Sequence, residues 1–281
     1  VKLGLHRPLF KALGISTKRG LPPFTKERFS SWLRGQNLGN ESKKVVLFND
    51  SYTEFNYPHI AQSAFHIMRK AGYQVIVEKW TCCGRPMLSK GFLKGARKKA
   101  QALVDQFLPY AKDGIAIVGL EPSCIFTIAD DYPSLLSGSD CELVSKSCMS
   151  FDKWVSQEIQ KSDSKLSFHS AERLVKVHGH CHQKSIDGMG STLHALESVS
   201  GFRVEEINSG CCGVAGSFAY EEEHEDFSQK IAEDRLFPSI RSSPEDTLLL
   251  ANGLSCRSQI SHGLQRKSQH LAEVLYSCLS E

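Results

Sequence analysis

The chain has 281 residues, of which 41% are hydrophobic and 23% are charged, and its formal net charge is +3. This composition is typical of a globular protein and argues against long disordered regions. The small net charge gives no electrostatic reason to expect nucleic acid as a partner. No apolar run approaches the roughly 18 residues that a membrane-spanning helix needs, so no transmembrane segment is expected.

Residues 1–42 read as a linker or N-terminal extension. They show no charged start followed by an apolar stretch, as a secretory signal would. The chain has ten cysteines, and thiolates that bind metal must stay reduced. We therefore expect a cytoplasmic protein, either free or peripheral at the membrane, and a chain that is a piece of a longer one.

The first half of the chain predicts alternating strands and helices. A short apolar run without helical spacing indicates a buried strand, and apolar residues at helical spacing before a glycine indicate a helix. In chain order, the predicted elements are a strand at 43–50, a helix at 58–72, a strand at 73–79, a long helix at 94–114 that is bent or ends near Pro109, and a strand at 114–120. Cys82-Cys83-Gly84 follows the second strand, and Cys124 follows the third.

The second half repeats this order. The predicted elements are a strand at 173–182 that ends at Cys181, a helix at 191–201, a strand at 202–210, a helix at 221–240 with an acidic first turn, and a strand at 246–253. A second triplet, Cys211-Cys212-Gly213, follows the middle strand, and Cys256 follows the last. The same unusual triplet therefore occurs twice, at equivalent places.

The intervals between these positions support a tandem duplication. Cys82 comes 31 positions after Ser51, and Cys211 comes 30 positions after Cys181. We predict an α/β fold made of two Rossmann-like βαβαβ units with parallel sheets and right-handed crossovers. The expected divisions are the extension at 1–42, a first repeat at 43–150, a bridging segment at 151–172 and a second repeat at 173–281. Sites in such sheets form at the carboxyl ends of strands, where the repeated cysteines lie.

The second repeat offers a complete set of metal ligands. Cys181, Cys211, Cys212 and Cys256 follow three different strands and can converge on one centre. Four thiolates satisfy a [4Fe–4S] cluster or a structural zinc ion, although the spacing lacks the C-x₂-C pairs of zinc ribbons. The alternative is that these cysteines are buried and structural.

The first repeat offers a weaker second site. It has Cys82, Cys83 and Cys124, but Ser51 stands where a fourth ligand is expected. Three cysteines can hold an incomplete or differently ligated centre, or they can be the remains of a site that is now structural.

Three histidines surround Cys181 in the segment "HGHCHQK". His178, His180 and His182 are expected on one side of an extended chain, where they can bind metal, relay protons, hold a substrate carboxylate or simply line the strand end. His182 is the candidate catalytic residue because it adjoins a predicted ligand. Asp50 and Glu121 also stand at strand ends, either as functional carboxylates or as helix caps.

Four motifs resemble the cysteine-rich CCG domain pair. They are "CCGRPMLSKG", "IVGLEPSC", "HGHCHQK" and "SGCCGVAGSFAYEEEH". The pair is known from the B subunit of heterodisulfide reductase, the glycolate oxidase iron–sulfur subunit and anaerobic glycerol-3-phosphate dehydrogenase. The resemblance is closest to the C-terminal portion of fused FAD-linked D-2-hydroxyacid dehydrogenases, which act on D-lactate or D-2-hydroxyglutarate.

This resemblance implies an electron-transfer module. The family's ligand pattern falls on Cys181, Cys211, Cys212 and Cys256, with Gly253 where a further cysteine would stand. Electrons would pass from FAD through iron–sulfur centres to a quinone or another acceptor. The chain lacks a G-x-G-x-x-G fingerprint, so FAD is expected on another domain or subunit, alongside a ferredoxin-like domain.

The sequence is also compatible with two other functions. One is a thiol or disulfide oxidoreductase like heterodisulfide reductase, whose repeats each have five cysteines, whereas the repeats here have three and four. The other is a module that holds a partner subunit, with zinc or without metal.

Overall fold

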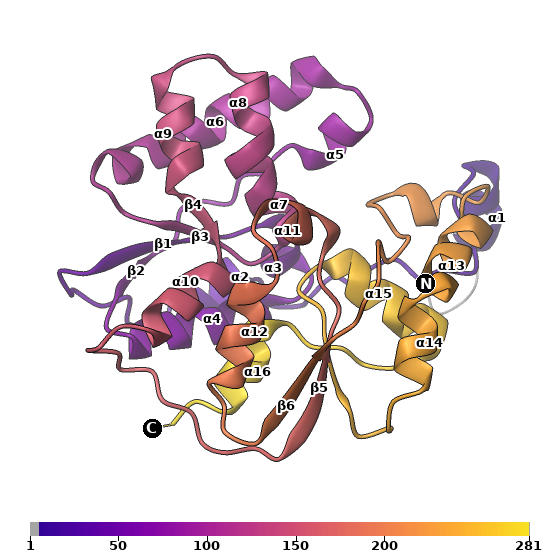
Figure 1. Ribbon diagram of the computed structural model, residues 1–281. Coiled ribbons are helices and arrows are strands. Elements are labelled where there is room, and N and C mark those ends of the chain that lie inside the picture. The colour runs from indigo at the N-terminus through magenta and orange to yellow at the C-terminus, as the bar shows by residue number, and fades with distance from the viewer. Residues whose placement is uncertain (1–5, 281) are drawn as a thin grey trace.

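The computed structural model describes residues 6–280 and contains two parallel β-sheets (Figure 1). The first sheet has the spatial order β2-β1-β3-β4 and the second has the order β6-β5-β7. The strands of the first sheet are β1 (Lys44–Phe48), β2 (Gln74–Ile76), β3 (Ile117–Gly119) and β4 (Cys148–Ser150). Those of the second are β5 (Arg173–Val177), β6 (Phe202–Glu206) and β7 (Leu248–Leu250). The predicted parallel α/β duplication is therefore confirmed.

The likeness of the two sheets extends to a fourth position. β4 pairs with β3, and Gln269 forms a parallel bridge with Leu250 at the same place beside β7. Each of these segments leads directly into a helix, which Ser150 caps in one repeat and His270 caps in the other.

Helices occupy the connections between the strands. Through the first repeat they are α1 (His6–Ala12), α2 (Phe29–Leu33), α3 (Ser51–Phe55), α4 (Pro58–Lys70), α5 (Arg85–Ser89), α6 (Leu93–Lys112), α7 (Pro122–Phe126), the π-helix η1 (Thr127–Asp131), α8 (Tyr132–Leu135), α9 (Ser139–Ser147) and α10 (Phe151–Ile159). Further along they are α11 (Cys181–Ile186), α12 (Gly190–Glu197), the 3₁₀ helix η2 (Phe218–Tyr220), α13 (Glu225–Asp234), α14 (Leu236–Arg241), α15 (Leu254–Leu264) and α16 (Leu271–Ser277).

Alternation along the strands divides the apolar residues among three cores. Val45 and Leu47 of β1 face a central core, whereas Val46 faces an outer core beside α6. In β7, Leu248 faces the central core and Leu249 faces a third core beside α14. Successive side chains of a strand point to opposite faces, so each sheet is covered on both sides, as parallel sheets require.

The helix that follows the fourth parallel segment of each half packs against a helix of the other half, in the central core. α10, at the start of the expected bridging segment, packs on α12 of the second repeat. α16, at the end of the second repeat, packs on α4 of the first. These four helices fill the space between the sheets (Figure 1), and this packing makes the repeats interdependent.

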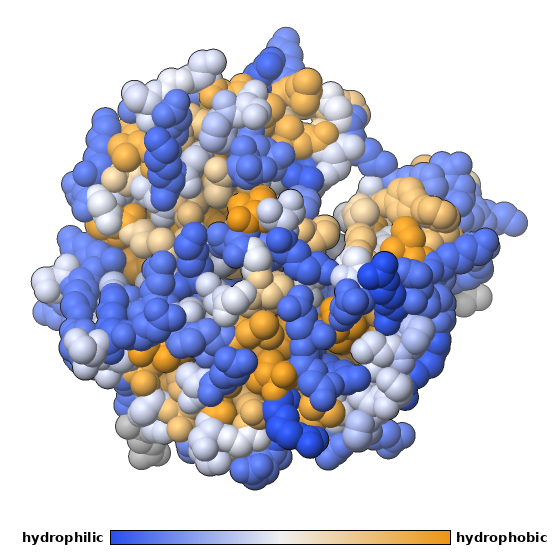
Figure 2. Space-filling view, in the orientation of Figure 1, coloured by the Kyte–Doolittle hydropathy of each residue, from blue (hydrophilic) through white to orange (hydrophobic). Residues whose placement is uncertain are grey.

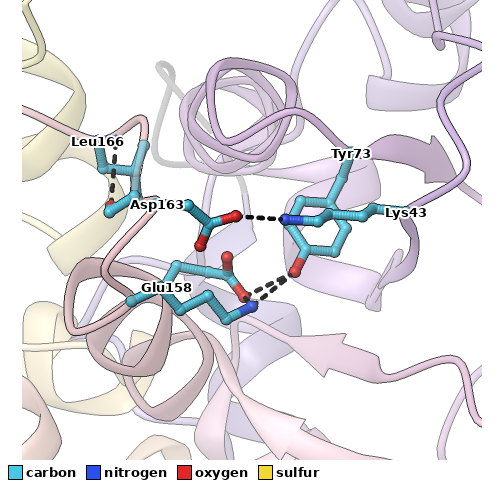
Figure 3. A network of polar contacts seen from close by, with 7 residues as sticks. Lys43, Tyr73, Glu158, Asp163 and Leu166 are labelled. Carbon is cyan, nitrogen blue, oxygen red and sulfur yellow. Dashed lines mark hydrogen bonds and ion pairs between the residues drawn. The ribbon is translucent and has the colours of Figure 1, made fainter.

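A polar network fixes the segment that follows α10 (Figure 3). Lys43 Nζ lies 3.2 Å from a carboxylate oxygen of Asp163, and the Tyr73 hydroxyl donates to Glu158 at 2.7 Å. Lys161 also donates to the Tyr73 hydroxyl, at 3.0 Å. The connection between the repeats is thereby attached to the first sheet, on the side away from the cysteines.

The surface is hollowed between the part of the molecule that carries α5 and the part that carries α13, as the space-filling view shows (Figure 2). The ion pair between Lys90, just after α5, and Glu221, just after η2, connects these two parts. Hydrophilic residues cover most of this face, and the apolar residues form separate patches between them (Figure 2).

The predicted long helix does not end near Pro109, which lies inside α6, so of the two predicted alternatives, a bend or an end, the end is excluded. Two other predicted elements were wrong in detail. The predicted helix at 221–240 is two helices, because Pro238 lacks an N–H and its ring would clash with the carbonyl of Asp234, and the chain departs from helical geometry at Arg235 (φ −144°). β5 ends at Val177, so Cys181 begins a helix instead of ending a strand.

Within residues 6–280, no helix has both the length and the hydrophobicity that crossing a membrane requires.

Candidate metal centre

The two Cys-Cys-Gly turns have the same backbone geometry. Gly84 and Gly213 have φ values of 83° and 91°, in the left-handed region that favours glycine. In each turn the glycine N–H donates to the sulfur of the first cysteine, at 3.4 Å for Cys82 and 3.3 Å for Cys211. A Cβ at Gly213 would lie 2.4 Å from the carbonyl oxygen of Ser228. The turn therefore requires glycine both for its conformation and for the close approach of α13.

The four cysteines of the second repeat come together in space. Cys181 is the first residue of α11, and Cys256 lies in the first turn of α15. Cys181 is within hydrogen-bonding reach of Cys211, Cys211 of Cys212, and Cys212 of Cys256. Cys212 and Cys256 are 4% and 2% exposed, whereas Cys181 is exposed to solvent. The set therefore has a buried end and an open end.

Hydrogen bonds divide these thiols into donors and acceptors. Hydrogen bonds with Cys181 and Cys212 lower the pKa of Cys211, and a hydrogen bond with Cys212 lowers the pKa of Cys256. The same contacts raise the pKa of Cys181 and of Cys212. Two of the four sulfurs therefore favour the thiolate form, which is the form that binds metal.

The first repeat has the same arrangement of side chains as the second, but with three thiols and one hydroxyl in place of four thiols. Ser51 is the first residue of α3, as Cys181 is of α11, and its hydroxyl lies within hydrogen-bonding reach of Cys82. Cys83 lies between Cys82 and Cys124. Ser51 thus occupies the place of the fourth cysteine.

The pKa of each thiol in the first repeat is raised. A hydrogen bond with Cys83 and burial raise the pKa of Cys82. A hydrogen bond with Cys124 and burial raise the pKa of Cys83, although its contact with Cys82 acts in the opposite direction. The hydrogen bond with Cys83 lowers the pKa of Cys124, but burial and the carboxylates of Asp50 and Glu121 outweigh it. This site therefore keeps its protons in the absence of metal.

Asp50 and Glu121 both cap helices, which was one of their two predicted roles. Asp50 accepts from the N–H groups of Tyr52 and Thr53 at 2.8 and 3.1 Å, and burial raises its pKa to about 6, assisted by the charge of Glu121. Glu121 accepts from Ser123 in its own repeat and from the N–H of Leu254 in the other, at 2.8 Å. It therefore links the loops that carry Cys124 and Cys256.

The three histidines near Cys181 diverge, contrary to the expectation of one extended row. His178 is buried next to Cys212 and Cys256. His180 caps α11, its Nδ1 accepting from the N–H of His182 at 3.2 Å. His182 lies 3.2 Å from Arg85 of the first repeat, and burial lowers its pKa, with Arg85 acting in the same direction. The three histidines do not form an extended row because the chain turns into helix α11 at Cys181.

The position of Gly253 explains why a fifth cysteine is missing. A Cβ at this residue would lie 2.3 Å from Cδ2 of His180. Any side chain at position 253 would therefore displace the imidazole that caps α11. In this chain the imidazole of His180 fills the space that a side chain at position 253 would need.

Sequence reasoning missed two residues that surround the site. Arg85 directly follows Gly84, yet it reaches across to His182 and pairs with Asp131 at 2.7 Å. Lys184 donates to the carbonyls of Ser209 and Gly210, just before Cys211. The signal for both was their place, two and three residues from predicted ligands, but their direction depends on tertiary packing.

The donor set of the second repeat suits a soft metal centre. Four sulfurs converge, and a fifth donor, Nε2 of His178, is buried without a hydrogen-bond partner among the described residues. Thiolate and imidazole are ligands for zinc and for iron–sulfur clusters. The residues present therefore fit a metal centre of either kind.

The fold, with a cysteine site in each of two repeats, agrees with a family of cysteine-rich domains that comparison with known proteins identifies. The family model of the CCG cysteine-rich domain matches residues 48–129 and 175–261, so both repeats are covered. The chain belongs to this family of cysteine-rich domains.

Several curated proteins are similar to most of the chain. The C subunit of anaerobic glycerol-3-phosphate dehydrogenase from Escherichia coli is 25% identical over 96% of this chain and 68% of its own length. D-2-hydroxyglutarate dehydrogenase of Pantoea ananatis is 26% identical over 83% of this chain, which spans only 23% of that protein. Lactate utilization protein A 1 of Bacillus mycoides is 24% identical over 83% of this chain and 96% of its own length. Similar sequences therefore occur in proteins named for three different substrates.

Proposed function

We propose that this chain is the iron–sulfur electron-transfer module of a flavin-dependent D-2-hydroxyacid dehydrogenase. The observation that carries the proposal is the convergence of Cys181, Cys211, Cys212 and Cys256, with one end buried and the other exposed. The names of the related dehydrogenases support the reaction class. A [4Fe–4S] cluster, when bound there, takes up and releases one electron at a time.

The protein's contribution is to position this centre and to adjust its environment. The Gly213 N–H donates to the sulfur of Cys211, and donors of this kind raise the potential of an iron–sulfur centre. The exposed end, at Cys181, is the side on which a redox partner can approach. A hollow of about 280 Å³, lined in part by Ser209, Gly210 and Cys211, opens beside the set.

The proposed partners lie outside this chain. Hydride removal from the hydroxy acid belongs to FAD on another domain or subunit, and a ferredoxin-like domain is the proposed donor to the cluster. A quinone is the proposed acceptor, and a reducing compartment, with the protein in the cytoplasm or at the membrane surface, is the proposed location. Cys82, Cys83 and Cys124 are proposed as a weaker second site, and His182 remains the candidate for a catalytic role.

The test is to purify the protein without oxygen and to measure its absorption together with iron, acid-labile sulfide and zinc. We expect a broad visible band that dithionite bleaches, and about four irons and four sulfides per chain. Zinc alone, or no metal after reconstitution with iron and sulfide, would refute the electron-transfer role and favour a module that only holds a partner.

Direct disulfide reduction is disfavoured by the packing of Gly253. The five-cysteine arrangement expected for that chemistry requires a side chain where His180 lies. In this proposal the module therefore transfers electrons, and the bonds of the substrate are broken and formed on a partner domain or subunit.

A further inference from the structure

His178 is held rigidly at the end of β5. Its backbone N–H donates to the carbonyl of Leu250 in β7 at 2.8 Å, and its side chain is 2% exposed. Backbone and side chain are thus fixed between two strands of the second sheet. The direction of the imidazole is set by this packing and not by solvent.

One nitrogen of this imidazole is anchored by a hydroxyl, and the ring also lies within hydrogen-bonding reach of the Cys256 thiol. Nδ1 lies 2.7 Å from the hydroxyl of Ser209, which in turn lies 3.4 Å from the carbonyl of Ile207. When that hydroxyl donates to the carbonyl, its oxygen accepts from Nδ1–H, and Nε2 is left with its lone pair. Nε2 is the one imidazole nitrogen among the buried polar atoms that lack a hydrogen-bond partner in residues 6–280.

The ring also lies close to two of the four sulfurs. The ligand atoms of His178, Cys212 and Cys256 are all within 4.8 Å of one another, and all three residues are buried. A single tetrahedral ion such as Zn²⁺ or Co²⁺, with bonds of 2.0–2.3 Å, holds nitrogen and sulfur donors roughly 3.6 Å apart, so a small closure would bring these three donors onto such an ion, whereas in a cluster they would bind different irons. An imidazole that binds metal commonly gives its other N–H to an oxygen nearby, and the Ser209 hydroxyl is placed to accept from Nδ1.

We propose that His178 is a ligand of the metal centre through Nε2, so that its imidazole takes one of the four terminal positions of a [4Fe–4S] cluster and one cysteine of the second repeat is not a ligand. The inference rests on the proposed function, because it assumes that the second repeat holds metal. It assigns the buried end of the centre to His178, Cys212 and Cys256 and leaves Cys181 as the ligand at the open end. The centre then has mixed nitrogen and sulfur ligation.

Pulsed EPR on protein labelled with ¹⁵N-histidine tests this ligand directly. The labelled protein is reconstituted with iron and sulfide without oxygen and then reduced with dithionite. We expect the strong nitrogen coupling of a directly bound imidazole, and we expect it to disappear in His178→Gln. His180→Gln and His182→Gln should retain the coupling, and His194→Gln, a histidine that contacts Ser156 on another helix, is the matched control.

The possible results separate this inference from the proposed function. A reduced cluster without strong nitrogen coupling, or one whose coupling persists in His178→Gln, would overturn the role of His178 while leaving the module intact. If no cluster forms, the proposed function fails and Co²⁺ alone, added to metal-free protein, tests the ligand. His178→Gln should then shift the d–d absorption and weaken Co²⁺ binding at least tenfold, and unchanged spectra would overturn the inference.

Should His178→Gln fail to fold, Ser209→Ala provides the second test. It keeps the imidazole and removes only the anchor of Nδ1. The nitrogen coupling should persist in this variant with a changed magnitude. Loss of Nδ1's partner with no change in the coupling would mean that the measured nitrogen is not His178.

Discussion

The two cysteine sites share a backbone and differ in their surroundings. Each has a left-handed glycine after two cysteines, and each has a further cysteine in the first turn of the helix after the third strand. In the first repeat, the carboxylates of Asp50 and Glu121 face Cys124. In the second, the imidazoles of His178 and His180 face Cys256.

Hydrogen bonds between the thiols and burial, together with these neighbouring groups, set the protonation of the thiols. Negative charge near a thiol disfavours the thiolate, whereas an imidazole or a donated hydrogen bond favours it. The pKa values are raised at all three thiols of the first site, Cys82, Cys83 and Cys124. In the second site they are raised at Cys181 and Cys212 but lowered at Cys211 and Cys256. The duplicated fold thus keeps the geometry of the turn in both copies, and only the second copy has thiols whose pKa is lowered.

The largest expected effect comes from removing a central sulfur of the second site. Cys212→Ser should abolish the visible band and the reduction of the acceptor, while substrate still reduces the flavin of the complete dehydrogenase. Cys212 contacts both Cys211 and Cys256, so no other thiol can replace it. Cys83→Ser, at the equivalent place in the first repeat, is the matched control and should retain about four irons.

Retention of the band in Cys212→Ser would contradict the placement of the centre. Equal loss in Cys83→Ser and Cys212→Ser would show that both copies hold metal, and the contrast between the two sites would then be wrong.

Completing the first site should make it resemble the second. Ser51→Cys places a fourth thiol within reach of Cys82. In metal-free protein we expect a second Co²⁺ ion to bind at least tenfold more tightly than in the wild type, because the fourth thiolate completes a tetrahedral set. Absorption titration measures this, and Ser123→Cys, next to Cys124, is a control for the mere addition of a thiol. Unchanged Co²⁺ binding would mean that the carboxylates, and not the missing ligand, limit this site.

The two turn glycines should differ in their tolerance of alanine. Gly213→Ala places a Cβ 2.4 Å from a backbone carbonyl, whereas Gly84→Ala meets the side chain of Lys99 first, at 3.2 Å. Both substitutions carry the cost of a left-handed residue, about 1–2 kcal/mol, and overpacking adds about 1–3 kcal/mol in Gly213→Ala alone. Urea unfolding of both variants measures the difference, and equal losses would argue against the close approach of α13.

The smallest expected effect concerns the cap of the first site. The pKa of Asp50 is about 6 in the folded protein, above the ordinary carboxyl value of about 3.9. The folded state therefore holds this proton more tightly, and stability falls as pH rises from about 4 to about 6. Asn caps a helix as well as Asp does, so Asp50→Asn should stabilise the protein by about 1–3 kcal/mol at pH 7 and much less near pH 4.

Urea unfolding at several pH values tests the Asp50 prediction. The quantity to follow is the difference in the free energy of unfolding between Asp50→Asn and wild type, since other groups such as His270 titrate in both proteins. Asp140→Asn, on the exposed side of α9, should show no such trend. If the difference in the free energy of unfolding does not change with pH, the pKa of Asp50 is not raised in the folded protein.

The sequence by itself determined the duplication, the parallel sheets and the cysteines at the strand ends. These features depend on local patterns: apolar runs, helical spacing and the repeated triplet, each read within a few residues. It also identified Ser51 as the substitute for Cys181, because the two intervals agree. What it could not supply was any direction that depends on packing between distant segments.

Tertiary structure decided the surroundings of each site. The turn into α11 gives the three histidines different partners: His178 lies beside Cys212 and Cys256, His180 caps the helix, and His182 contacts Arg85. Arg85 and Glu121 cross from one repeat to the other because the repeats pack together around the helices of the central core. The charges near a thiol come from residues far away in the chain, and Coulomb interactions depend on distance in space. That is why the sequence could place two equivalent sites and distinguish them by Ser51, whereas only the folded chain could give the charges around each.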